Sequence, residues 1–475
     1  MMKNKKKTKL AAGCVSLALM TAITACSSGG GGNAGGNANA EQTAVKTEDG
    51  KTVVSVSVMQ NDRFLQAAEA SFEKAHPDID IQINAAVATP EMGKVVRRAG
   101  GGQDPETEAN REKFVNSVNT ELMSGKGADI IAVQDLPFDK YAEKGLLADL
   151  RSLMKEDKDF NLQDYYEGVM DAVTKDGKQA ALPIRFSLDI MLASQAELAG
   201  AGVSVDDSKW TWKDFADIAR KLAKDEDGDG KPDKYTMSGM SKDRMLKLMV
   251  ESSYEHYVDT AGKKASFDQG DFAAMLENLK GLYDEGLVND GMPGPGQQSF
   301  GHMNLMMPMD LVMTPQLMFE GKGQVYQTPS GGEAKGMTYD SDLMLALNAK
   351  SGAKQEAWAF MKYLLSAEAQ GTPGIMGFSV RKDMTAKQVE ESMKMFENGN
   401  LKISGPDGEI SPPTMTDEDI KTIVDTIPRI KRFSGDDSAI MKMVLEEAAA
   451  FFEGRKSAEE AAKQLQNRAT IYLNE

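Results

Sequence analysis

Residues 53–83 read VVSVSVMQNDRFLQAAEASFEKAHPDIDIQI and determine the fold class. Their first six residues have the length and the β-branched content of a strand. Residues 63–75 then place apolar side chains, from Phe64 to Phe72, at the spacing of a helix. Residues 79–83 alternate isoleucine with polar residues, which predicts a second strand. The order of strand, helix and strand predicts a parallel sheet and therefore an α/β protein.

The length of the chain predicts more than one lobe. Another apolar run, residues 128–133, has the character of a buried strand, and Gln134 and Asp135 follow it directly. About 425 residues follow the start of the first strand, which is more than one hydrophobic core usually holds. We therefore expect two lobes.

The first 26 residues have the organisation of an export signal. Lysines crowd the start, residues 10–23 form a short apolar run, and small residues precede Cys26. Signal peptidases require this pattern, and the run is too short to span a membrane comfortably. Cys26 after small residues resembles a bacterial lipobox, in which a lipidated cysteine becomes the first mature residue. The alternative is a plain secretory signal with an incidental cysteine.

The segment after Cys26 supports tethering. Residues 27–40 are almost wholly Ser, Gly, Asn and Ala, which predicts a flexible spacer. The lipobox and spacer together predict a protein on the extracellular face of a Gram-positive cell membrane, held through its lipid anchor only. The other cysteine, Cys14, lies in the leader, so we expect no disulfide, thiolate metal site or cysteine nucleophile in the mature chain.

Charge excludes two classes of partner. The chain has a formal net charge of −17, and loss of a leader with five lysines makes the mature chain more negative still. Nucleic acid and anionic lipid surfaces would be repelled. The three histidines, His76, His256 and His302, show no zinc spacing.

Several segments resemble the extracellular sugar-binding proteins of ATP-driven importers, family 1. They occur in the order found in that family and are spread over nearly all of the mature body. The matching segments are residues 128–131 followed by Asp135, and residues 141–150, 181–187, 210–215 and 356–366.

The resemblance implies a fold and a function. The fold is an α/β, two-lobed periplasmic-binding-protein-like fold of type II, in which each lobe is a mostly parallel sheet flanked by helices and crossover strands form the hinge. The implied ligand is a carbohydrate, more specifically an oligosaccharide, and the implied partners are the permease subunits of an ABC transporter. We expect a monomer without catalytic residues. The expected boundaries are 1–25 for the signal peptide, 26–50 for the lipidated cysteine and spacer, 51–186 and 314–372 for the N-terminal lobe, and 187–313 and 373–475 for the C-terminal lobe.

Polar residues that follow strands, or lie at the crossover, are the candidate ligand contacts. Ligands of open α/β sheets bind beyond the carboxyl ends of the strands. Carboxylates and amides form hydrogen bonds with sugar hydroxyls, and an arginine can also orient them. The predicted ligand-binding residues are Gln60, Asp62, Gln134, Asp135, Arg185, Ser187, Trp210, Asp310, Tyr339 and Asp340.

Some of these candidates have a second interpretation. Asp62 can instead cap the helix that follows it. Arg185 can instead hold a carboxylate at the hinge. Trp212 and Trp358 are typical of apolar helix faces, and only Trp210 is left open as a sugar contact. This scarcity of tryptophan departs from the family, whose pockets often stack sugars on several aromatic rings.

An acidic loop predicts a calcium site. Asp225, Asp227 and Asp229 occupy positions one, three and five, with glycine at six and another acid at nine. Alternate spacing lets carboxylates converge on one ion. Position twelve is Thr236, so the usual closing glutamate is missing. The predicted ion site comprises Asp225, Asp227, Asp229, Lys231 and Asp233, and the alternative is a solvated acidic loop.

Two alternative functions are a ligand sensor and an exported enzyme. A ligand sensor would present its closed form to a membrane receptor with the same fold. An exported polysaccharide-active enzyme would need a carboxylate pair or a nucleophile with its base, and no Gly-x-Ser-x-Gly motif or histidine-centred arrangement is identifiable.

Overall fold

The strand–helix–strand unit predicted from residues 53–83 opens the fold. In the computed structural model, β1 (Thr52–Gln60) and β2 (Ile79–Val87) pair in parallel and α1 (Arg63–Ala75) connects them. The α1 helix buries Phe64, Leu65 and Phe72, the face that the helical spacing predicts.

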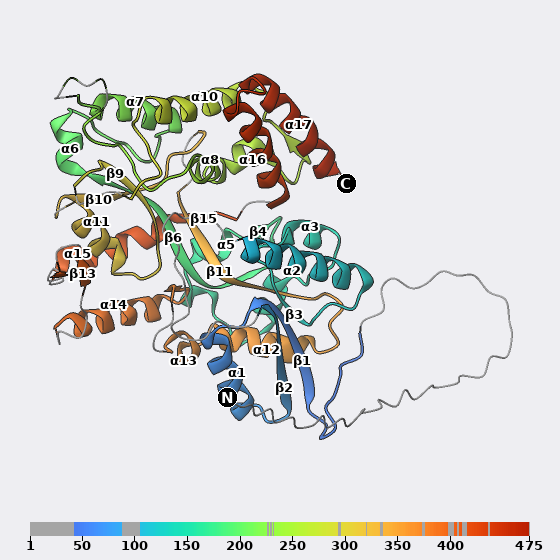
Figure 1. Cartoon of the computed structure of the whole chain (residues 1–475). Helices are drawn as coiled ribbons and strands as arrows, with labels where there is room; N and C mark the ends of the chain where they lie inside the picture. Colours follow the sequence, from blue (N-terminus) through green and yellow to red (C-terminus); the bar gives the residue numbers. More distant parts are fainter. Residues whose placement is uncertain are drawn as a thin grey trace, which may run out of the picture. The chain divides into compact units, whose positions relative to one another are not determined.

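The largest sheet in the described part of the chain holds nine strands (Figure 1). Its central order is β10-β6-β11-β3-β1-β2, while β9 and β12 also pair with β6, and β15 pairs with β11. Parallel pairing joins β1 to β2 and β3, and β11 to β15. The long strands β6 (Leu182–Ser194) and β11 (Met337–Leu347) pair antiparallel. The parallel order that the sequence predicts is therefore confined to part of the sheet.

Both faces of the sheet around β3 (Ile130–Ala132) are covered. Alternate residues of β3 and β11 belong to different apolar clusters, as strand geometry requires. We call the larger one the first core and the smaller one the outer cluster. The first core includes Val54, Val56, Phe72, Ile130, Leu188, Leu345, Phe360 and Ile430. The outer cluster includes Phe114, Val118, Leu122, Ile131, Val133, Tyr141, Val173, Met344 and Ala346.

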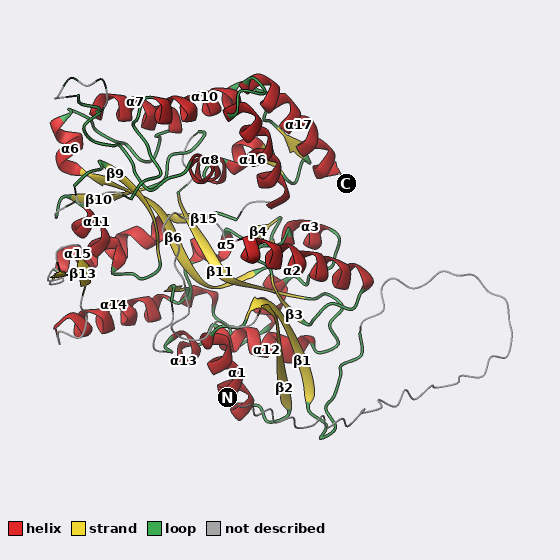
Figure 2. Cartoon of the chain, in the orientation of Figure 1, coloured by secondary structure: helices red, strands yellow, loops and turns green. Residues whose placement is uncertain are grey.

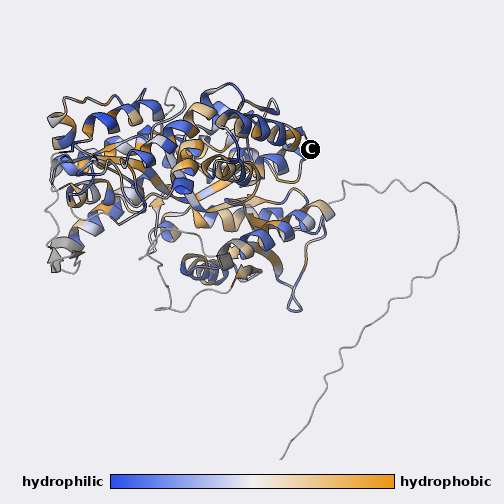
Figure 3. Cartoon of the chain, turned by 45° about the horizontal axis from the view of Figure 1, so that its top comes forward, coloured by the Kyte–Doolittle hydropathy of each residue, from blue (hydrophilic) through white to orange (hydrophobic). Residues whose placement is uncertain are grey.

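A separate second core is built mainly from helices. Its buried residues come from α7 (Trp212–Leu222), α8 (Lys242–Glu251), α10 (Asp271–Asp284), α16 (Ser438–Phe452) and α17 (Ala458–Asn474), and they pack on Met191, Ala193 and Phe300. Figure 3 shows hydrophobic and hydrophilic residues interleaved along the helices, the pattern of amphipathic helices. Two cores joined by β6, which supplies buried residues to both, fit the two lobes predicted from length, and the exact lobe boundaries stay a prediction.

The remaining elements are shown in Figure 2. The other strands are β4 (Thr174–Lys175), β5 (Lys178–Gln179), β7 (Val258–Asp259), β8 (Lys264–Ala265), β9 (Phe300–Leu305), β10 (Gly323–Tyr326), β12 (Phe378–Ser379), β13 (Ile403–Gly405), β14 (Gly408–Ile410) and β15 (Ile430–Phe433). The other helices are α2 (Pro105–Ser124), α3 (Phe138–Glu143), α4 (Leu150–Glu156), η1 (Leu162–Asp164), α5 (Glu167–Asp171), α6 (Gln195–Gly200), α9 (Tyr254–Tyr257), α11 (Asp310–Met318), α12 (Lys354–Leu364), α13 (Ala367–Gln370), α14 (Lys382–Glu397), α15 (Asp417–Thr426) and η2 (Ile427–Arg429).

The structure does not describe every residue. The described residues are 42–87, 105–225, 228, 230, 232–292, 296–319, 321–332, 336–372, 376–397, 403–405, 408–410, 416–435 and 438–474. The export signal, Cys26 and residues 27–40 therefore lie outside the described part. Among the helices that are described, none combines the length and the apolar character needed to cross a membrane.

Candidate functional site

One strand, β6, changes from apolar to polar along a single face. Phe186, Leu188 and Ile190 belong to the first core, while Met191 and Ala193 point to the other face and belong to the second core. On that second face the preceding positions are Arg185, Ser187 and Asp189. The apolar core therefore ends at Met191 and a polar surface begins. We call Arg185, Ser187, Asp189 and their cross-strand neighbours the polar face.

The neighbouring strands extend the polar face sideways. Asn304 of β9 lies opposite Asp189, and His302 lies opposite Met191. On β11, Asp340 lies opposite Ser187 and Thr338 lies opposite Asp189. Thr338 is paired in turn with Arg432 of β15. Directly opposed residues share a face of a sheet, so these side chains form one polar row across four strands.

Arg185 joins three separate segments of the chain. Its Nε and Nη2 atoms donate to the two carboxylate oxygens of Asp342, at 2.8 and 2.9 Å. Its Nη2 also donates to Asp62, which caps α1 with its other oxygen by accepting from the Leu65 N–H at 2.8 Å. The structure therefore confirms that Asp62 caps α1, while its role as a ligand contact stays a prediction.

Asp340 combines an exposed side chain with a raised pKa. The surrounding protein removes enough solvation to raise the pKa of this carboxyl to about 6, and the charges of Asp189 and Asp342 add to that rise.

A cavity of about 410 Å³ lies at the end of β3, where Gln134 and Asp135 follow the strand. Gln134 lines it and accepts a long hydrogen bond from the Met344 N–H at 3.4 Å. Asp135 lies 3.8 Å from Arg111. Three parts of the chain line this cavity. Gln134, Phe138 and Val173 come from the region of the outer cluster, and Glu251, Tyr254 and Val258 come from the region of the second core. Arg432 and Phe433 of β15 complete the lining.

The four remaining predicted ligand residues are not among those described above for the polar face or the cavity lining. Gln60 is the exposed last residue of β1. Asp310 begins α11, where its carboxylate accepts from the Met307 N–H at 2.9 Å and burial raises its pKa. Trp210 is buried and donates to the Gln327 carbonyl at 2.9 Å. The buried Tyr339 donates to the Val169 carbonyl at 2.8 Å. We leave these last two residues out of the site that we propose.

The acidic loop is described only in part. Asp225 accepts from the Gly228 and Gly230 N–H groups, at 2.7 and 2.9 Å, and Gly230 has a positive φ of 84° that suits glycine. Asp227, Asp229 and Lys231 lie outside the described residues. Thr236, at position twelve, is buried among residues of the second core. Within the described residues no group of three or more His, Cys, Asp or Glu side chains is arranged to hold a metal ion.

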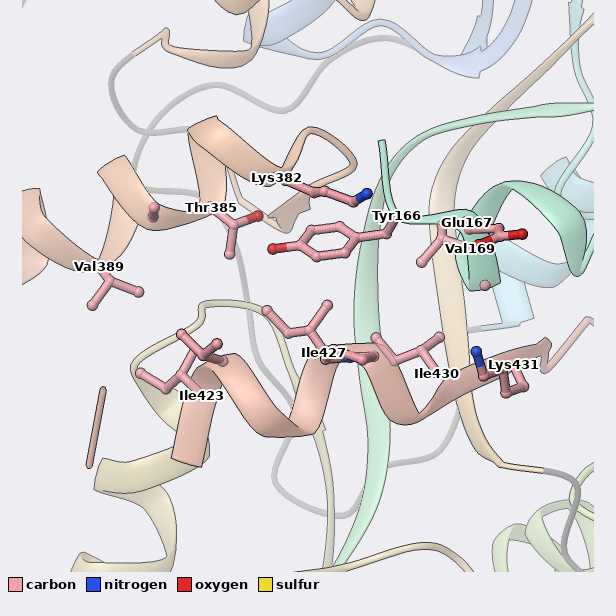
Figure 4. Close-up of a pocket in the computed structure, with 14 residues that line it drawn as sticks. Tyr166, Glu167, Val169, Lys382, Thr385, Val389, Ile423, Ile427, Ile430 and Lys431 are labelled. Atoms are coloured by element: carbon pink, nitrogen blue, oxygen red, sulfur yellow. The ribbon is translucent and has the colours of Figure 1, made fainter. Parts of the chain in front are cut away.

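A second cavity, of about 460 Å³, lies among α5, α14 and α15 (Figure 4). Its lining is mainly apolar, with Val389, Ile423 and Ile427 at its walls, and the ring of Tyr166 extends into it. Its apolar lining residues belong to the first core or pack on it, so this cavity does not join the two cores. We do not include it in the candidate site.

Sequence reasoning missed six residues of the polar face. They are Asp189, His302, Asn304, Thr338, Asp342 and Arg432. The signal that could have found Asp189 is the period of two along β6 after Arg185 and Ser187.

Comparison with known proteins identifies a family model that matches this chain. The model of bacterial extracellular solute-binding proteins matches residues 59–371. No curated protein matches the chain.

Several solved structures share the fold. An ABC substrate-binding protein from Listeria monocytogenes in complex with cycloalternan is 18% identical, with a TM-score of 0.50 and coverage of 89% of this chain and 99% of that one. The sugar-binding protein MalE from Xanthomonas citri is 15% identical, with a TM-score of 0.54 and coverage of 89% and 98%. A periplasmic oligogalacturonide binding protein from Yersinia enterocolitica is 16% identical, with a TM-score of 0.53 and coverage of 89% and 99%. At these identities the likeness shows the fold alone, which confirms the predicted α/β, two-lobed fold of type II.

Proposed function

Because the chain belongs to the family of bacterial extracellular solute-binding proteins, we propose that it is a lipid-anchored receptor that captures a carbohydrate and delivers it to an ABC permease. The ligand would bind to the polar face and bridge the two lobes. Ligand binding would then shift the population toward the closed state, which docks on the permease subunits. In this proposal the protein acts as a monomer and performs no reaction.

One observation carries the proposal: the polar face is centred on β6 and β9, and the buried residues of these two strands belong to both cores. Carboxylates, amides and an arginine line this face, and these groups form the hydrogen bonds that sugar hydroxyls require. Phe138, Tyr254 and Phe433 line the adjoining cavity and offer apolar surface for a sugar ring. Two of the structures that share the fold are a complex with cycloalternan and an oligogalacturonide binding protein.

A thermal-shift screen of mono- and oligosaccharides on the purified protein tests this function. A ligand that binds only the folded state raises the melting temperature, and the rise grows with the logarithm of the ratio of its concentration to its dissociation constant. We expect at least one saccharide to do so, and Asp135→Ala to weaken its binding by about tenfold, since one lost charged hydrogen bond is worth about 1.4 kcal/mol. A screen in which only non-carbohydrate solutes stabilise the protein would contradict the proposal.

Lipid anchoring gives a separate prediction. Cys26→Ser removes the sulfur that would carry the lipid, so the variant should be released to the medium or remain uncleaved. Cell fractionation with an antibody against the folded body measures this, and wild type serves as the membrane-bound control. A variant that stayed both processed and membrane-bound would show that Cys26 is not the anchor.

Calcium binding by the acidic loop is also part of the proposal. Converging carboxylates repel one another without a cation, so calcium should raise the melting temperature of wild type. Asp227→Ala combined with Asp229→Ala should abolish that rise, while Asp284→Ala on the exposed face of α10 should preserve it. An equal calcium response in the double variant would remove the ion site from this loop.

A further inference from the structure

The polar face holds more carboxylates than cationic side chains to pair with them. Asp62 and Asp342 share the single guanidinium group of Arg185. The carboxylate of Asp189 accepts from the Asn304 side-chain amide at 3.3 Å, and that of Asp340 accepts from the Ser341 N–H at 2.7 Å. Within the described residues, neither Asp189 nor Asp340 forms an ion pair with a lysine or an arginine.

Asp189 and Asp340 are diagonal neighbours on the same face. Asp340 lies opposite Ser187, two residues before Asp189 on β6, so the two β-carbons are about 7 Å apart or less. Lys247 is close enough to affect the charge of Asp340, but it forms an ion pair with Glu251 at 3.2 Å. The pair of aspartates therefore presents two negative charges that the protein does not neutralise by contact.

His302 supplies a second, independent feature. Its side chain is only 7% exposed, and neither ring nitrogen has a hydrogen-bond partner within the described residues. Its Nε2 atom lies 3.8 Å from Asp189 Oδ1, which is too long for a hydrogen bond. Burial lowers the pKa of His302, so at neutral pH the ring is uncharged, with one N–H donor and one acceptor nitrogen. Buried polar atoms are normally hydrogen-bonded, so the two nitrogens, which solvent does not reach in this structure, would gain a partner if a ligand group entered beside Asp189.

We propose that the ligand is a sugar with a protonated primary amine, whose ammonium group lies between Asp189 and Asp340 and whose hydroxyl group bonds to His302. This inference rests on the proposed carbohydrate function. An ammonium group offers three donors and no acceptor, which matches two carboxylates without their own cations. A uronic acid would bring another negative charge to the same face. The net charge of −17 acts in the same direction over a longer range, by attracting cations and repelling anions.

Calorimetry at pH 7 with matched disaccharides tests the inference. The probes are a glucosamine disaccharide, its N-acetylated form, the neutral disaccharide cellobiose, and digalacturonate. We expect the glucosamine disaccharide to bind at least about tenfold more tightly than its N-acetylated form, and digalacturonate to bind most weakly. Spermidine, an amine without sugar hydroxyls, should bind more weakly than the amino sugar, and equal affinity would contradict the assigned sugar.

Two variants test whether the charges of Asp340 and Asp189 select the amine. Asp340→Asn and Asp189→Asn keep the shape of the side chain and remove its charge, so each should lower the affinity ratio of the amine to the N-acetylated sugar by about tenfold. Asp284→Asn, which removes an exposed charge from α10, should leave that ratio as in wild type. An unchanged ratio in both the Asp340→Asn and the Asp189→Asn variant would overturn the inference.

The outcomes separate this inference from the proposed function. If neutral disaccharides bind as tightly as the amino sugar, the inference is wrong and the carbohydrate function stands. If no saccharide of the series binds and spermidine does, the carbohydrate function is wrong and the inference falls with it.

Discussion

Replacing Arg185 with methionine is expected to lower the free energy of unfolding by about 2 to 3 kcal/mol and to abolish measurable ligand binding. The Arg185 side chain is 8% exposed, and its guanidinium group holds Asp62 of the α1 cap against Asp342 of β11. Methionine retains much of the apolar stem but loses the guanidinium carbon, which lies 5.5 Å from the centroid of the Phe64 ring. The loss therefore comes mainly from two carboxylates left facing each other without their cation. Their exposed fractions, 34% and 53%, keep the cost below that of a fully buried pair.

Urea unfolding followed by circular dichroism measures this effect against a matched control. Arg220 also forms a two-nitrogen contact with a carboxylate, Glu285, but both partners are more than a third exposed. Arg220→Met should therefore cost less than about 1 kcal/mol. Adding Asp342→Asn to Arg185→Met should restore part of the lost stability, because it removes one of the stranded charges. Equal losses in Arg185→Met and Arg220→Met would show that the Arg185 network does not hold these segments together.

The local part of the fold could be predicted from the sequence because its signals are local. The helical spacing and the aspartate before it placed α1 at Arg63–Ala75, and the alternation of isoleucine placed the start of β2. Of the two roles predicted for Asp62, the helix cap is confirmed, and its second oxygen accepts from Arg185. The N-cap is a local feature, whereas the contact with Arg185 joins residues 123 positions apart.

The rest of the site depends on which strands pair and in which register, and neither can be determined from the sequence alone. Asp189, Asn304 and Thr338 meet only because β9, β6 and β11 pair in a particular register. The register also shifts between Asp340 and Leu343, next to Asp342, whose carboxylate bonds to Arg185. The sequence also fails to separate Tyr339 from Asp340. The two residues are adjacent, but the side chain of Tyr339 lies on the opposite face of the strand and belongs to the first core.

The largest loss of stability is expected for Asp129→Ala, at about 3 kcal/mol or more. Asp129 is 9% exposed and accepts three hydrogen bonds: from Ser55 N–H at 2.8 Å, from Ser55 Oγ at 2.7 Å and from Ser351 Oγ at 2.6 Å. These bonds connect β1, the start of β3 and the segment before α12. Residues 128–131 are one of the segments by which the sequence resembles the family, and these hydrogen bonds give a structural reason for the aspartate in it.

Alanine at position 129 would leave the Ser55 N–H and two hydroxyls without their charged acceptor, and each such loss costs about 1 to 3 kcal/mol. Asp129→Asn retains one acceptor oxygen and should cost less. Asp80→Ala is the matched control, since Asp80 accepts a single exposed bond from Gln82 and should cost less than about 0.5 kcal/mol. Asp129 precedes β3 while the candidate site follows it, so ligand affinity, measured where the variant is still folded, should stay at the wild-type value. A mild effect equal to that of Asp80→Ala, or a specific loss of affinity, would show that Asp129 does not act by holding these strands together.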